Sequence, residues 1–178
     1  MGMKLPESLE QHFNDQITLE FASSMAYRQL AIEMDAQSLP GIGAWLRHQA
    51  DEEIVHANKF IDHLVDRDNH PSIGTVAAPE VKPGASPVEV FEAALAHEQR
   101  VSEAIRALYR ASEEAGDLES RPLLFWFIEE QIEEESTVSE IITRLSLVEG
   151  DGNGLLRLDS ELGARKAGST ENTGSEVG

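Results

Sequence analysis

The chain has 178 residues, of which 14 are basic and 33 acidic, so its formal net charge is −19, and it contains no cysteine. This charge disfavours binding to nucleic-acid backbones and anionic membranes, and it attracts cations. The lack of cysteine excludes disulfides, iron–sulfur clusters and thiol nucleophiles. No apolar run approaches the ~18 residues of a membrane span, and the first residues lack a signal-peptide pattern. We therefore expect one soluble, cytoplasmic domain that binds neither nucleic acid nor membrane.

Apolar residues spaced by three and four predict four long helices, at about residues 6–35, 42–68, 87–116 and 119–148. A short break at Pro40-Gly41 separates the first two, and the segment 69–86, which contains three prolines, separates the middle two. A shorter amphipathic helix is predicted at residues 155–162, after the glycine-rich run 150–154. Strand-type alternation is not evident in the sequence, so the predicted fold class is all-α.

The lengths of the connections predict how these helices pack. Short links make the first and second helices, and the third and fourth, antiparallel hairpins. The segment 69–86 reaches roughly 60 Å when extended, whereas a 27-residue helix is roughly 40 Å long. It is long enough to run the length of the bundle, which predicts a four-helix bundle with one long crossover between helices two and three. The polar tail, residues 166–178, is expected to be disordered.

Each predicted long helix carries a carboxylate near its midpoint, and the chain has a single Glu-x-x-His, formed by Glu53 and His56. Residues three apart share a helix face, so both can bind one ion. The candidate ligands at this level are Glu20, Glu53, His56, Glu98, Gln131 and Glu134. Buried carboxylates are costly without cations, and an oxygen-rich set with one imidazole suits iron or manganese. If Glu53 and Glu134 bridge two metals, both metals can share one O2, to which each Fe(II) gives one electron.

The chain resembles the non-haem bacterial ferritins over roughly residues 6–165. The motifs that carry the resemblance are Leu19-Glu20 followed by Tyr27, Asp51-Glu52-Glu53-Ile54-Val55-His56, His97-Glu98-Gln99, and the segment 125–135. The resemblance implies a ferritin-like bundle with its short fifth helix in residues 1–165. It implies one iron held by Glu20, Glu53 and His56, and a second held by Glu53, Glu98 and Glu134 with Gln131 beside it. It also implies a third iron position at Glu52, Glu130 and Glu133 with Glu134, and an electron-donating role for Tyr27.

Departures from neighbouring families sharpen this resemblance. The second half of the site reads Gln131-x-x-Glu134, as in ferritins and unlike bacterioferritins. Bacterioferritins bind haem through a methionine next to the Glu-x-x-His glutamate, where this chain has Ile54, so we expect no haem. The five other histidines are expected at the surface or beside the metal ligands; they are His12, His48, His63, His70 and His97. Trp126 is expected to have a packing role.

The function implied by the resemblance is iron storage and detoxification. Fe(II) and O2 would be the substrates of a ferroxidase, and ferric mineral would collect inside a hollow homo-oligomer of about 24 subunits. Since residues 155–162 are too short for a stable isolated helix, we expect their apolar stripe (Leu155, Leu158 and Leu162) to pack on another subunit. The alternative is an O2-activating di-iron enzyme acting on an organic substrate or on peroxide. A purely structural bundle is a third, weaker hypothesis.

Overall fold

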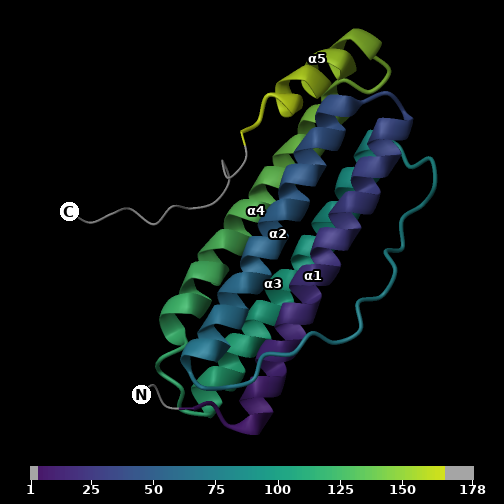
Figure 1. Cartoon of the computed structure of the whole chain (residues 1–178). Coiled ribbons are helices and arrows are strands. Elements are labelled where there is room, and N and C mark those ends of the chain that lie inside the picture. Colours follow the sequence, from purple (N-terminus) through teal and green to yellow (C-terminus); the bar gives the residue numbers. More distant parts are fainter. Residues whose placement is uncertain (1–3, 167–178) are drawn as a thin grey trace.

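The structure is a computed structural model that describes residues 4–166. This range contains no strand and five helices, which are α1 (Glu7–Ala36), α2 (Pro40–Asp66), α3 (Pro87–Glu114), α4 (Arg121–Leu147) and α5 (Gly152–Gly163). Figure 1 shows α1–α4 side by side and α5 at one end of the bundle. The predicted all-α bundle with a long crossover and a fifth helix is confirmed. None of the described helices has the length and apolar character needed to cross a bilayer. The predicted disorder of the tail concerns residues that, apart from Lys166, lie outside the described range.

Local sequence signals explain where the helices begin. Proline suits a first helical turn because its φ is already helical and no N–H is needed there, and α2 accordingly begins at Pro40, two residues before the predicted start. A capping box opens α3: the Ser86 hydroxyl accepts from the Glu89 N–H at 3.2 Å, and the Glu89 carboxylate accepts from the Ser86 N–H at 2.8 Å. At α5 the prediction was short by one turn, because the Asp151 carboxylate accepts from the Asn153 N–H at 3.1 Å and starts the helix inside the glycine-rich run.

The crossover between α2 and α3 runs along α1, as Figure 1 shows. Backbone N–H groups that come later in the crossover donate to side chains that come later in α1. Ser72 N–H donates to Asn14 at 2.8 Å, Gly74 N–H to Thr18 at 2.8 Å, and Gly84 N–H to Glu33 at 2.9 Å. The crossover therefore travels parallel to α1 from its first turns to its last, and α3 starts at the far end of the bundle, as predicted.

Two apolar clusters occupy the two ends of the bundle. The α5-end core contains Leu30, Met34, Leu46, Phe91, Ile141 and other buried side chains. The opposite core contains Phe13, Ile17, Phe60, Ile105, Phe127 and others. On every long helix a short stretch without a buried core member separates the two, and these stretches hold Glu20, Glu53, Glu98 and Glu134. On α1, the partly buried Leu19 and Phe21 beside Glu20 pack against the opposite core. The carboxylates therefore share one level, and we call this level the polar layer.

The expectation for α5 was wrong in one respect, because its apolar stripe is covered within the chain. Leu158 and Leu162 are buried in the α5-end core and Leu155 packs against it. A Cβ at Gly41 would lie 1.9 Å from the carbonyl oxygen of Asp159, so only glycine allows α2 and α5 to approach this closely. The bundle is open at this end and α5 closes it, so the stripe needs no second subunit.

Candidate metal centre

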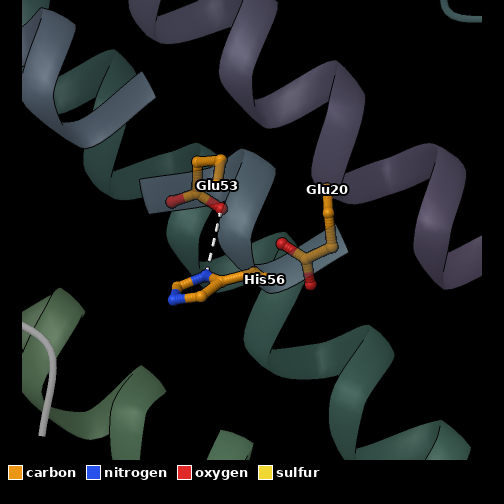
Figure 2. A group of neighbouring side chains, drawn as sticks. All are labelled: Glu20, Glu53 and His56. Atoms are coloured by element: carbon orange, nitrogen blue, oxygen red, sulfur yellow. Dashed lines mark ion pairs between the residues drawn. The ribbon is translucent and has the colours of Figure 1, made fainter. Parts of the chain in front are cut away.

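Three candidate metal ligands from α1 and α2 converge in the polar layer. Glu20, Glu53 and His56 are at most 1% exposed, and one ligand atom of each lies within 4.8 Å of the others. Figure 2 shows the Glu20 and Glu53 carboxylates and the His56 ring turned toward one another. His56 Nδ1 lies 3.4 Å from Glu53 Oε2. The i,i+3 spacing read from the sequence therefore places Glu53 and His56 as expected, and α1 supplies the third group.

A second group shares His56 with the first. His56, Glu130 and Glu134 also offer ligand atoms within 4.8 Å of one another, and all three are buried. Glu130 belongs by resemblance to the third iron position, yet here it lies beside His56. The two groups overlap at one imidazole, and both are built from a single chain.

Glu98 is held in the same layer by two donors rather than grouped with His56. The Tyr27 hydroxyl donates to Glu98 Oε1, and Gln131 Nε2 donates to Glu98 Oε2 at 3.1 Å. Gln131 also reaches the Ser102 hydroxyl at 3.2 Å, which ties α4 to α3. The expected neighbours Tyr27, Glu98 and Gln131 are thus in contact, with Glu98 as the acceptor of both.

Burial dominates the electrostatics of this layer. Desolvation raises the pKa of Glu20 well above its usual range, and the nearby Glu53 raises it further. Desolvation also raises the pKa of Glu53 and of Glu134, and the charge of Glu98 adds to both shifts. The pKa of Glu98 is raised by burial too, although the Tyr27 and Gln131 hydrogen bonds oppose this. Burial therefore disfavours the charged form of these carboxylates in the metal-free protein, and bound cations would offset that cost.

Several ligand atoms have no hydrogen-bond partner among the described residues. They are Glu20 Oε2, Glu53 Oε1, His56 Nε2 and Glu134 Oε1, each with almost no solvent contact. Buried polar atoms in native proteins are nearly always bonded, so unbonded ones call for an explanation. Here the unbonded atoms are carboxylate oxygens and an imidazole nitrogen, the donor set that suits iron or manganese.

Two glutamines that the sequence reasoning did not assign to the site orient the ligands. Gln16 Nε2 donates to Glu20 Oε1 at 2.8 Å, one turn earlier on α1. Gln49 Nε2 donates to Glu134 Oε2 at 2.7 Å, linking α2 to α4. The available signal was spacing, because Gln16 precedes Glu20 by four residues and Gln49 precedes Glu53 by four.

The residues of the implied third iron position are divided. Glu130 is 1% exposed and faces His56 and Glu134, whereas Glu133 is exposed. Glu52 is buried in an ion pair with Arg165, at 2.7 Å. The structure therefore does not bring these three side chains together as one of its metal-ligand groups.

The other histidines stay outside both groups. His12 and His70 are exposed, and His48 and His63 are half-buried. His97 is buried with its Nε2 2.6 Å from the Ser23 hydroxyl, and burial together with Arg100 lowers its pKa to about 4. Trp126 packs edge-on against His56 with 5.6 Å between ring centres, consistent with the predicted packing role.

Comparisons with known proteins agree with this architecture. Residues 10–148 match a family model described as a ferritin-like domain. The chain is 36% identical over 160 residues to the bacterial non-heme ferritin of Escherichia coli O6:H1, covering 90% of this chain and 96% of that one. It is 32% identical over 161 residues to the bacterial non-heme ferritin of Staphylococcus aureus (strain USA300), with 90% and 96% covered.

A solved structure shows the same fold. The open pore ferritin of the hyperthermophilic archaeon Archaeoglobus fulgidus superposes with a TM-score of 0.88 at 31% identity, covering 92% of this chain and 100% of that chain. Sequence and structural similarity extend over all four long helices that hold the polar layer. The chain belongs to the ferritin family.

Proposed function

We propose that the protein is a ferroxidase that stores iron, oxidising Fe(II) with O2 at the polar layer of each subunit. The observation that carries this proposal is the pair of overlapping ligand groups that share His56, with buried ligand atoms that lack hydrogen-bond partners. Two Fe(II) ions each lose one electron to one O2, which takes up two protons and leaves as hydrogen peroxide. Placing two metals in one site lets a single O2 receive both electrons.

The chain's own residues have distinct parts in this proposal. Glu20, Glu53, His56, Glu130 and Glu134 bind Fe(II), and Glu98 completes the site at the level of α3. Burial and the charge of Glu98 raise the pKa of Tyr27, so its phenol stays protonated and donates to Glu98. Tyr27 is thereby held against the polar layer, where it is suited to give an electron to oxygen intermediates.

Stopped-flow oxidation of Fe(II) in air tests the site. The double variant Glu53→Ala/His56→Ala removes ligands from both groups and is expected to abolish a fast phase of about two irons per subunit. The matched control is His48→Ala/Asp51→Ala, which removes one histidine and one acid from the same helix at positions outside the layer. An unchanged fast phase in the Glu53/His56 variant, with circular dichroism confirming the fold, would contradict the site.

The storage part of the proposal requires a large assembly of identical subunits. Large apolar side chains are exposed on four of the helices, including Ile32 at 55%, Val65 at 57%, Ile132 at 67% and Leu156 at 60%. In an assembly of this kind, contacts between subunits would cover some of these side chains. With 19.6 kDa per chain, a shell of about 24 subunits has a native mass of roughly half a megadalton.

One observation favours the di-iron enzyme as a second candidate. A pocket of about 370 Å³ lies between the crossover, α1 and α3, and its lining includes Tyr27 and His97. A pocket next to a redox-active layer is a place for a small organic substrate. Native mass spectrometry separates the two functions, since a stable monomer or dimer would contradict storage and favour the enzyme.

A further inference from the structure

Arg165, which follows α5, places its guanidinium against the buried face of α2. Its Nη2 donates to both oxygens of Glu52, at 2.8 and 2.7 Å. The two side chains are only 6% and 5% exposed. The guanidinium carbon also lies 4.6 Å from the centre of the Trp45 ring, and Nη1 lies 3.4 Å from the Trp45 carbonyl oxygen. A cation from the end of the described chain is thus bound at α2 by a carboxylate, an aromatic face and a carbonyl.

This contact continues into the polar layer through one amide. Arg165 Nη1 donates to Gln49 Oε1 at 3.1 Å, and Gln49 Nε2 donates to Glu134 Oε2 at 2.7 Å. Because a guanidinium has donors and no acceptor, it requires the amide oxygen of Gln49 to face it. The amide nitrogen must then face Glu134, so Arg165 determines which group Gln49 presents to a ligand of the metal centre.

The electrostatic link between Glu52 and the centre is direct. Glu52 is the immediate neighbour of Glu53, and its charge acts on both Glu53 and Glu134. A buried carboxylate at this point requires a positive partner. Arg165 supplies that partner from within the chain and engages both oxygens of Glu52, which leaves little room for a metal ion at the same carboxylate.

We propose that Arg165 is a tethered cation that excludes a further metal ion from Glu52, beside the polar layer. A divalent cation and the guanidinium compete for the same two oxygens, so a metal binds at Glu52 only when Arg165 withdraws. The inference rests on the proposed function in that the competing ion would come from the iron that enters the neighbouring centre. Arg165 is a positioning residue for Gln49 and Glu134 as well, and it connects the end of α5 to the metal centre.

Equilibrium dialysis against Zn(II) at neutral pH tests the proposal without any redox chemistry. Arg165→Gln removes the competing charge, and we expect this variant to bind one more Zn(II) per chain than the unmodified protein. Arg144→Gln is the matched control, because Arg144 makes an ion pair with Glu161 of α5 while its side chain is 41% exposed. This control is expected to bind as many ions as the unmodified protein.

Two further variants separate the outcomes. Glu52→Gln/Arg165→Gln is expected to lose the additional ion, since the carboxylate that holds it is gone. Arg165→Lys keeps a positive charge without the two-oxygen contact, so its additional ion should bind more weakly than in Arg165→Gln. It serves as the test if Arg165→Gln fails to fold.

The possible results distinguish this inference from the proposed function. Equal Zn(II) counts in the unmodified protein and in Arg165→Gln (or in Arg165→Lys, if that is the variant that folds) would overturn the role of Arg165 and leave the two-metal site standing. An additional ion that persists in the double variant would also overturn it. No bound Zn(II) in the unmodified protein, together with one ion in Arg165→Gln, would support the tethered cation while contradicting the two-metal site.

Discussion

The polar layer and the two apolar cores have opposite effects on the stability of the bundle. The cores are packed with aliphatic and aromatic side chains, as where Phe60 stacks on Phe127 with 4.1 Å between ring centres. The polar layer, between them, buries carboxylates whose pKa values are raised and several of whose oxygens lack hydrogen-bond partners. The cores therefore stabilise the fold, while the buried carboxylates of the layer are costly in the metal-free protein, and bound cations would offset that cost. The bundle tolerates the polar layer because an apolar core is well packed at each end of the bundle.

The largest loss of stability is expected when a core side chain is truncated. Phe60→Ala removes a ring that is fully buried and contacts both Phe13 and Phe127. A loss of about 3–5 kcal/mol in the free energy of unfolding is expected, measured by chemical denaturation in chelator. Phe125→Ala, at a position that is 52% exposed, should cost far less; equal losses would show that the cores do not carry the stability.

Removing a carboxylate from the polar layer should raise the stability of the metal-free protein, the opposite of truncating a core side chain. Glu53→Gln removes a buried charge and is expected to stabilise the metal-free protein at pH 7 by about 1–3 kcal/mol. Glu92→Gln, at an exposed position of α3, is the control and should change little. A metal-free Glu53→Gln protein that melts well below the unmodified one would contradict the idea that the layer is costly.

The pH dependence of the metal-free protein follows from the same carboxylates. Their native pKa values lie above the ordinary 4.5 of glutamate, so the folded state holds more protons than the unfolded state between these values. The stability they contribute is fully present below pH 4.5 and is lost as pH rises through the native pKa values. The melting temperature measured in EDTA should therefore fall as the pH rises from 5 to 8, and it should fall less in the Glu53→Gln variant. A rising profile would contradict the burial of ionisable groups.

A smaller effect is expected where α5 supports α2. Leu39, at the N-cap of α2, has no side-chain acceptor, and Asp159 of α5 instead accepts from the Ile42 N–H at 2.8 Å. Asp159→Ala should cost about 0.5–2 kcal/mol by denaturation, while Asp159→Asn retains an acceptor and should cost less. Identical losses in both variants would show that the hydrogen bond to Ile42 does not matter.

The smallest effect is expected for charges that join α1 and α2 at the surface. Arg28 and Asp51 form an ion pair at 2.5 Å, but their side chains are 44% and 65% exposed. Arg28→Ala should change the free energy of unfolding by about 0.2–1 kcal/mol at low salt, and by less when salt is added. A loss as large as that of Phe60→Ala would contradict the contrast between buried and exposed charges.

Much of the fold could be predicted because its signals are local. Apolar spacing and breaks at proline and glycine placed the helix ends within about three residues, and the length of the crossover determined the topology. Helical spacing also predicted that Glu53 and His56 share a face, and the midpoints of the helices placed Glu20 at the same level. These features depend on periodicity and on length, which a sequence states directly.

The remaining features depend on contacts between residues distant in the chain. Spacing defines the face of α4 but not which of its glutamates reaches His56, and packing places Glu130 there while Glu98 is held by Tyr27 and Gln131. The docking of α5 on its own bundle required the close approach at Gly41, which no local pattern announces.

The sequence by itself determined the helices, their order and the level at which acidic groups would be buried. Tertiary structure alone decided which of those groups face one another, and it brought Arg165 to Glu52 across 113 positions of the chain. The physical reason is that helix periodicity sets the direction of a side chain to within a face. Bringing together the atoms of a metal centre also requires the distance and rotation between helices, which the packing of the two apolar cores sets.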